Sequence, residues 1–266
     1  MEKQNKISLF EELKLLRRNI IEIEFKPAFI LISVAVIEVI SHYYCGTRAF
    51  RKYFAKLFEL GNLARFYRYI YWLSADFIIH FIVPLLLIAL VLREKPRDFG
   101  LGWGDYRMGI KIFVIFMIIM MPILWIATSF PGFIQKYPHT SAVLSNWTLF
   151  AIYNLCFILY MIGWEFIWRG YMLFGLKEKF GYYAVLIQMI PFVILHNGKP
   201  VAETLGAIVA GIALGILAWR TNSFWYCAMT HASVMIAINL IATLRFRTDV
   251  YGIGIASLFE LIKGIF

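Results

Sequence analysis

The chain has 266 residues, of which 61% are hydrophobic and 16% are charged, and its mean hydropathy is +0.73. Soluble domains are roughly 45–50% apolar and about 25% charged, so this composition excludes a soluble fold, intrinsic disorder and a small disulfide scaffold, and it predicts a polytopic helical membrane protein. The formal net charge of +10 fits basic loops that face a lipid bilayer with anionic headgroups, and no nucleic-acid-binding motif accompanies it.

Residues 1–26 are predicted to form an amphipathic segment. Ser8 and Glu11 have the spacing of a capping box at a helix N-terminus. After this cap, apolar side chains recur on one helical face, and lysine and arginine fall elsewhere. Residues 48–60 repeat this pattern, so we expect two basic amphipathic helices that lie in the membrane interface.

Residues 27–266 are predicted to form a single membrane domain. A helix needs about 20 mostly apolar residues to cross a bilayer. About eight segments fit this description, and the fifth and eighth are short: 27–44, 69–92, 109–130, 147–174, 182–195, 201–219, 224–244 and 252–266. The predicted fold class is therefore all-α, with about eight transmembrane helices and additional interfacial helices.

Loop charge predicts the orientation of these spans. The connection 93–111 carries five basic residues and the connection 131–146 carries only Lys136, so the former is expected in the cytoplasm. With eight spans, both termini are then cytoplasmic too. The first connection carries six basic residues and opposes this orientation, which its interfacial helix explains. We expect an integral protein of a bacterial cytoplasmic membrane.

Ionisable residues inside the predicted spans are the candidate functional residues, because charge at membrane depth is costly. Glu165 and Arg169 are four residues apart and share a helix face. Together with His196 and His231 they offer a carboxylate and two imidazoles, which can activate a water molecule and stabilise an oxyanion. The same three groups, Glu165, His196 and His231, are equally able to hold a divalent metal such as zinc.

Other polar residues favour structural roles. Asp76 with His80, and Glu38 with His42, are also four residues apart, and we interpret each as a hydrogen-bonded pair within its own helix. The functional alternative is a proton relay in a transporter, although the chain lacks visible repeat symmetry. His139, beside a proline in a loop, is expected to be solvated.

Three motifs follow one another in the second half of the chain. They are Glu165-Phe166-Ile167-Trp168-Arg169-Gly170, then Phe192-Val193-Ile194-Leu195-His196, then His231. This set resembles the CPBP family of intramembrane proteases, which includes CAAX-processing endopeptidases and bacteriocin-processing or self-immunity proteins. The resemblance covers about residues 147–244. It implies about eight helices and hydrolysis of a peptide bond in a membrane-associated protein or peptide.

Two positions depart from the family pattern. Trp164 stands where the family has the first of two glutamates, and Met235 stands where it has an asparagine. Asn239, one helical turn further, is a substitute for that asparagine. Glu203 is a second candidate carboxylate, although an acid in the first turn of a helix also complements the helix dipole.

The family gives the water-activating role to the first glutamate, which Trp164 replaces here, so we expect the following roles in this chain. Glu165 or Glu203 activates water together with His196, and His231 stabilises the oxyanion. Arg169 orients Glu165. These residues should converge on a polar cavity, and Trp164 should pack against a neighbouring helix or lipid. We therefore expect an intramembrane endopeptidase; the alternatives are an inactive membrane scaffold or immunity protein and a proton-coupled transporter.

Overall fold

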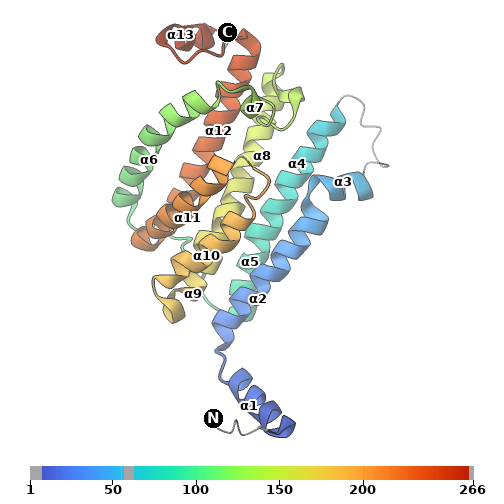
Figure 1. The fold of residues 1–266 in the computed structure, drawn as a ribbon, viewed down its shortest axis with the longest axis vertical. Helices are drawn as coiled ribbons and strands as arrows, with labels where there is room; N and C mark the ends of the chain where they lie inside the picture. Colours follow the sequence, from blue (N-terminus) through green and yellow to red (C-terminus); the bar gives the residue numbers. More distant parts are fainter. Residues whose placement is uncertain (1–7, 55, 57–62, 200, 264–266) are drawn as a thin grey trace, which may run out of the picture.

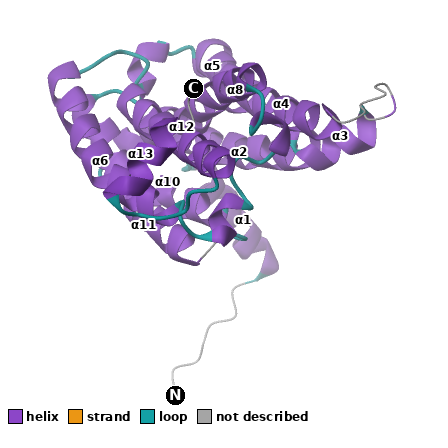
Figure 2. Cartoon of the chain, turned by 90° about the horizontal axis from the view of Figure 1, so that it is seen from above, coloured by secondary structure: helices purple, strands orange, loops and turns teal. Residues whose placement is uncertain are grey.

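The computed structural model describes residues 8–54, 56, 63–199 and 201–263. The described residues form helices and loops without a strand, as the view from above shows (Figure 2). The helices are α1 (Leu9–Ile21), α2 (Phe25–Ile40), α3 (Thr47–Tyr53), α4 (Ala64–Phe77), α5 (Val83–Leu86), α6 (Tyr106–Ala127), α7 (Pro131–Ile134), α8 (Trp147–Glu165), α9 (Leu173–Phe180), α10 (Tyr183–Ile194), α11 (Val201–Thr221), α12 (Trp225–Thr248) and α13 (Ile255–Lys263). The prediction of an all-α polytopic membrane protein is confirmed.

Six helical segments among the described residues are long and apolar enough to cross a membrane. They are Phe25–Cys45, Ala64–Leu92, Tyr106–Ala127, Trp147–Phe180, Glu203–Thr221 and Trp225–Thr248. Several of them run through short π-helical turns, so that α4 with α5, and α8 with α9, form continuous rods. The spans stand side by side as one bundle (Figure 1).

The fifth and eighth predicted spans are not full crossings. The fifth corresponds to α10, whose 12 residues reach only about 18 Å at about 1.5 Å per residue. A hydrocarbon core is about 30 Å thick, so α10 is too short to cross it. The eighth corresponds to α13, which has 9 residues and lies across one end of the bundle (Figure 1). Apolar length alone overestimated the number of spans.

The two ends of the described chain lie at opposite ends of the bundle. Figure 1 places α1 beyond the lower end and α13 at the upper end. The expectation that both termini are cytoplasmic depended on eight complete crossings, and it stays a prediction. Between the descending helices α8 and α11, α10 returns the chain only part of the way.

The predicted surface helices are present in part. α1 begins with the capping box, because Ser8 Oγ accepts from the Glu11 backbone N–H and the Glu11 carboxylate accepts from the Ser8 N–H. The second helix, α3, ends at Tyr53, and most of the remainder of its predicted range, residues 55 and 57–60, lies outside the described residues.

The core of the bundle lies around α8, which packs against α4 and α12. α8 buries eight residues between Tyr153 and its last residue, Glu165. Gly163 permits the close contact with the α4 rod, because a Cβ atom there would lie 3.2 Å from the Phe77 Cα. Asn146 starts the helix by accepting from the Leu149 N–H at 3.0 Å. α8 therefore fixes the position of Glu165 in the middle of the protein.

Candidate active site

Glu165 is the centre of a buried charged cluster. It ends α8, and Arg169 follows in the π-helical turn Phe166–Met172, all of which is buried. Arg169 Nη1 lies 3.1 Å from the carboxylate, and both side chains have 0% exposure. His231 of α12 places its Nδ1 atom 2.6 Å from Glu165 Oε1. The carboxylate therefore contacts a cation on its own helix and an imidazole on another.

The π-helical turn positions Arg169 through close packing. A Cβ atom on Gly170 would lie 2.3 Å from the Phe166 ring, so the glycine leaves room for that ring. The Arg169 guanidinium then lies over the Phe192 ring at 4.1 Å from its centroid. π-Helical turns inside α-helices are frequent at functional sites.

His196 lies in the turn after α10, outside the six long spans. Its Nδ1 lies 2.7 Å from the Phe192 carbonyl oxygen. A carbonyl only accepts hydrogen bonds, so this contact assigns the proton to Nδ1 and leaves the Nε2 lone pair free. Burial and the nearby Lys199 charge lower the pKa of His196 to about 4, so the imidazole is neutral at physiological pH.

The Phe192 ring contacts three of the predicted site residues, His196, His231 and Arg169. Its ring centroid lies 4.6 Å from that of His196 and 6.4 Å from that of His231. Because the same ring also carries the Arg169 guanidinium, the four predicted residues gather from α8, the π-helical turn, the end of α10 and α12. This role of Phe192 was not predicted from the sequence. The four-residue spacing from Phe192 to His196 was the available signal, since it places a helix carbonyl beside the ring.

Trp164 packs inside the protein against neighbouring helices, as expected. Its ring centroid lies 5.7 Å from that of Trp168, 6.0 Å from that of Phe192 and 6.3 Å from that of His196. On another side it meets His80 at 6.0 Å. The indole thus stands beside His196, where the family pattern has a carboxylate.

Glu203 and Asn239 have other partners. Glu203 Oε1 lies 2.8 Å from Lys199 Nζ and 3.3 Å from the Tyr137 hydroxyl. Asn239 donates to Asn154 Oδ1 at 2.9 Å, which links α12 to α8. Asn239 is two turns, about 12 Å along the helix, from His231. Asn239 is therefore not bonded to the Glu165 cluster, whereas the Glu203 charge lies near enough to act on His196 while its carboxylate is bonded to Lys199 and Tyr137.

The metal alternative, with Glu165, His196 and His231 as ligands, stays a prediction. Within the described ranges, no group of three or more His, Cys, Asp or Glu residues is arranged to hold a metal ion. Glu165, the third expected ligand beside His196 and His231, is already bonded to His231 Nδ1 and Arg169. No step of the chemistry proposed below uses a metal.

The other two predicted pairs do not form as expected, because their members bond to other residues on the same or on a neighbouring helix. Asp76 accepts from Ser41 Oγ and from Trp72 Nε1, each at 2.6 Å. His80 Nε2 lies 3.1 Å from Glu38 Oε1. The predicted Glu38–His42 bond is absent from the described contacts, since His42 is exposed and packs on Tyr43. Four-residue spacing permits a pair, but these carboxylates find better-placed donors elsewhere.

His139 is not a solvated loop residue. Its Nδ1 lies 2.6 Å from the Tyr153 hydroxyl, and its ring lies 5.3 Å from Tyr69 and 5.5 Å from Trp72. Burial and the nearby Lys199 charge lower the pKa of His139 to about 4. The surrounding rings come from separate parts of the chain, so the local sequence gave no sign of them.

One known protein family matches the part of the chain that contains this cluster. Residues 144–237 match the family model described as Rce1-like, type II CAAX prenyl endopeptidase Rce1-like. The resemblance to the CPBP family is confirmed. The match includes Glu165, Arg169, His196 and His231, and it supports intramembrane endopeptidase activity on protein or peptide substrates at the membrane. No curated protein and no solved structure matches the chain.

Proposed function

We propose that the protein is an intramembrane endopeptidase in which His196 activates water and the Glu165–His231 pair stabilises the oxyanion. One observation carries the proposal: each imidazole is held at Nδ1, by the Phe192 carbonyl in His196 and by the Glu165 carboxylate in His231. Hydrogen bonds of this kind fix the orientation of an imidazole. Both Nε2 atoms therefore remain available to water and substrate.

The reaction begins at His196. Its neutral Nε2 accepts a proton from water as the water oxygen attacks the carbonyl carbon of the scissile peptide. The carbonyl oxygen becomes an oxyanion. His231, whose Nδ1 is hydrogen-bonded to Glu165, donates its Nε2–H to this oxyanion. When the C–N bond breaks, His196 returns its proton to the leaving amine, so the proton balance closes.

Glu165 is a positioning residue in this mechanism. Its carboxylate is bonded to His231 and Arg169 and buried at 0% exposure, so it holds His231 in place and does not contact water. The mechanism needs no carboxylate at the position of Trp164, because the base is an imidazole. The substrate we propose is a membrane-associated protein or peptide, and the match to a type II CAAX prenyl endopeptidase family favours CAAX prenyl peptides.

The experiment uses purified protein in liposomes that contain a membrane-tethered peptide library with prenylated and unprenylated members. Mass spectrometry detects new peptide termini. We expect cleavage by the wild type and its loss in His196→Ala and in His231→Ala. His42→Ala is the matched control, because His42 is exposed and packs only on Tyr43 among the described rings. Unchanged cleavage in both site variants would refute the proposal.

An inactive scaffold is the second candidate function. It is favoured by Trp164, which fills the place beside His196 with an indole. A scaffold predicts no turnover of any library member by the wild type. It also predicts that His196→Ala leaves the cellular function intact.

A further inference from the structure

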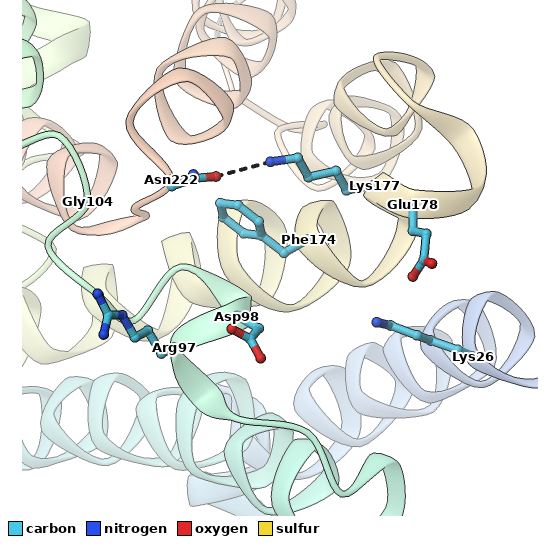
Figure 3. Close-up of a pocket in the computed structure, with 9 residues that line it drawn as sticks. Lys26, Arg97, Asp98, Gly104, Phe174, Lys177, Glu178 and Asn222 are labelled. Carbon is cyan, nitrogen blue, oxygen red and sulfur yellow. Dashed lines mark hydrogen bonds between the residues drawn. The ribbon is translucent and has the colours of Figure 1, made fainter.

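A pocket of about 530 Å³ opens at the end of the bundle where α2 begins and α9 ends. It lies apart from the Glu165 cluster, and its lining comes from four separate parts of the chain. The polar lining residues are Lys26, Arg97, Asp98, Lys177, Glu178 and Asn222 (Figure 3). Phe174 contributes an apolar surface in their midst.

The pocket lies at the depth of lipid headgroups. Lys26 is the second residue of the span Phe25–Cys45, and Lys177 lies three residues before the end of the span Trp147–Phe180. Exposed aromatic side chains surround the same end, with 64% exposure for Trp103 and 60% for Tyr182. Tryptophan and tyrosine gather where a membrane meets water. A ligand at this depth is in contact with the bilayer surface.

The charges of the pocket are not paired with each other. Within the part of the chain that the structure describes, the side chains of Arg97, Asp98 and Glu178 have no hydrogen bond and no ion pair. Lys26 is paired with Glu94 at 2.8 Å, outside the pocket lining. Unpaired positive and negative side chains around one pocket are complementary to a ligand that carries a positive and a negative group.

The positively and negatively charged side chains are spread around the pocket. In Figure 3 the Arg97 guanidinium lies toward Gly104, and Lys177 extends to Asn222, to which it donates at 3.0 Å. Glu178 extends toward the side where Lys26 lies, and Asp98 lies between Arg97 and Lys26. A ligand that carries both an anionic and a cationic group can contact both kinds of side chain.

We propose that the pocket binds the headgroup of a phospholipid that carries a phosphodiester and a primary ammonium, a phosphoethanolamine headgroup. Arg97 and Lys177 bind the phosphodiester oxygens through charge-assisted hydrogen bonds. Asp98 and Glu178 accept from the ammonium N–H groups. A choline headgroup has no N–H donor for these carboxylates, and a glycerol headgroup has no cation. The glycerol backbone of the lipid packs on Phe174.

The bound lipid would join elements that also position the Glu165 cluster. α9, which carries Lys177 and Glu178, continues the π-helical turn of Arg169. Asn222 lies three residues before α12, which carries His231. A headgroup held by Arg97, Asp98, Lys177 and Glu178 ties α9 to the turn that precedes α6, beside the start of α12. Lipid binding should therefore raise the thermal stability of the bundle, whether or not the protein is a protease.

The test measures lipid binding on the delipidated full chain in detergent by native mass spectrometry. The ligands are short-chain phosphatidylethanolamine, phosphatidylcholine and phosphatidylglycerol, and free phosphoethanolamine. Losing the hydrogen bonds of one charged group weakens binding about tenfold. We expect phosphatidylethanolamine to bind about tenfold tighter than the other two lipids, and Arg97→Gln and Asp98→Asn each to remove that preference.

Arg107→Gln is the matched control, because Arg107 is an exposed basic residue close to the same end of the bundle and outside the pocket lining. It should bind phosphatidylethanolamine like the wild type. Arg97 and Asp98 are exposed, so their variants should fold, and circular dichroism checks this. Equal binding of the three lipids, or unchanged preference in both pocket variants, would overturn the proposal. Binding of free phosphoethanolamine as tight as that of the lipid would overturn its assignment to a membrane lipid.

Discussion

The substitution Glu165→Gln removes the negative charge from the centre of the candidate site. Arg169 Nη1 lies 3.1 Å from the carboxylate, and Arg169 Nε and Nη2 have no hydrogen-bond partner within the described residues. Both side chains have 0% exposure, so water does not replace the lost charge. Breaking a buried ion pair by removing one partner costs about 3–5 kcal/mol, because the other charge stays buried and uncompensated. We expect a loss of folding free energy in this range.

Glu203→Gln provides the matched control. Its ion pair with Lys199 is 2.8 Å long, but the two side chains are 31% and 37% exposed. Exposed pairs contribute about 1 kcal/mol or less, so this variant should lose little stability. The assay is equilibrium unfolding in mixed micelles with increasing sodium dodecyl sulfate, followed by far-ultraviolet circular dichroism.

A double variant sharpens the test. Glu165→Gln combined with Arg169→Met removes both charges, so it should be more stable than Glu165→Gln alone. If Glu165→Gln lost no more stability than Glu203→Gln, the buried charges of Glu165 and Arg169 would not be coupled as their contact indicates. The proposed positioning role of Glu165 would then be wrong.

The remaining predictions concern the packing and the pH dependence of the site. Phe192→Leu removes the ring that contacts both imidazoles. It should lower kcat/KM on the tethered peptides about tenfold, which is a loss of about 1.4 kcal/mol in transition-state stabilisation. An unchanged kcat/KM would contradict this prediction. Gly163→Ala places a Cβ atom 3.2 Å from the Phe77 Cα, so it should destabilise the bundle by about 1–3 kcal/mol. Gly206→Ala is the control, because a Cβ atom there meets open space and should not destabilise the protein. Thermal unfolding measures both effects. His196 must be neutral to accept a proton, and its pKa is lowered to about 4. The value of kcat/KM should therefore stay level as the pH falls from neutrality and decline only as the pH passes through about 4. A decline centred on pH 6.5 would contradict this prediction.

The sequence was sufficient for the class of fold and for contacts within one helix. Composition alone indicates a helical membrane protein, since no soluble fold hides so much apolar surface. The Glu165–Arg169 contact follows from four-residue spacing, and the Ser8 cap follows from its motif. These features depend on neighbours in the chain, which a sequence displays directly.

Contacts between helices were harder to predict. Asp76 bonds to Ser41 and not to the histidine on its own helix, because the position of α2 against α4 depends on packing across the whole bundle. The rings around His139 likewise come from distant segments. Hydropathy also did not distinguish a crossing helix from α10 and α13, whose lengths and positions depend on what they pack against.

Trp164 changes the charge of the candidate site as well as its shape. In the family pattern two adjacent glutamates stand at residues 164 and 165, and here Glu165 is the single carboxylate of that pair. The Glu165 carboxylate offsets the charge of Arg169 and holds His231 at Nδ1, so that the opposite ring nitrogen of His231 can face the oxyanion. The oxyanion that forms during peptide hydrolysis carries one negative charge, and the proton taken from water leaves one positive charge on His196, so the net charge of the site does not change. A buried site of low dielectric strengthens the attraction between the oxyanion and donors that are already in place. A second carboxylate at residue 164 would add a negative charge that repels this oxyanion.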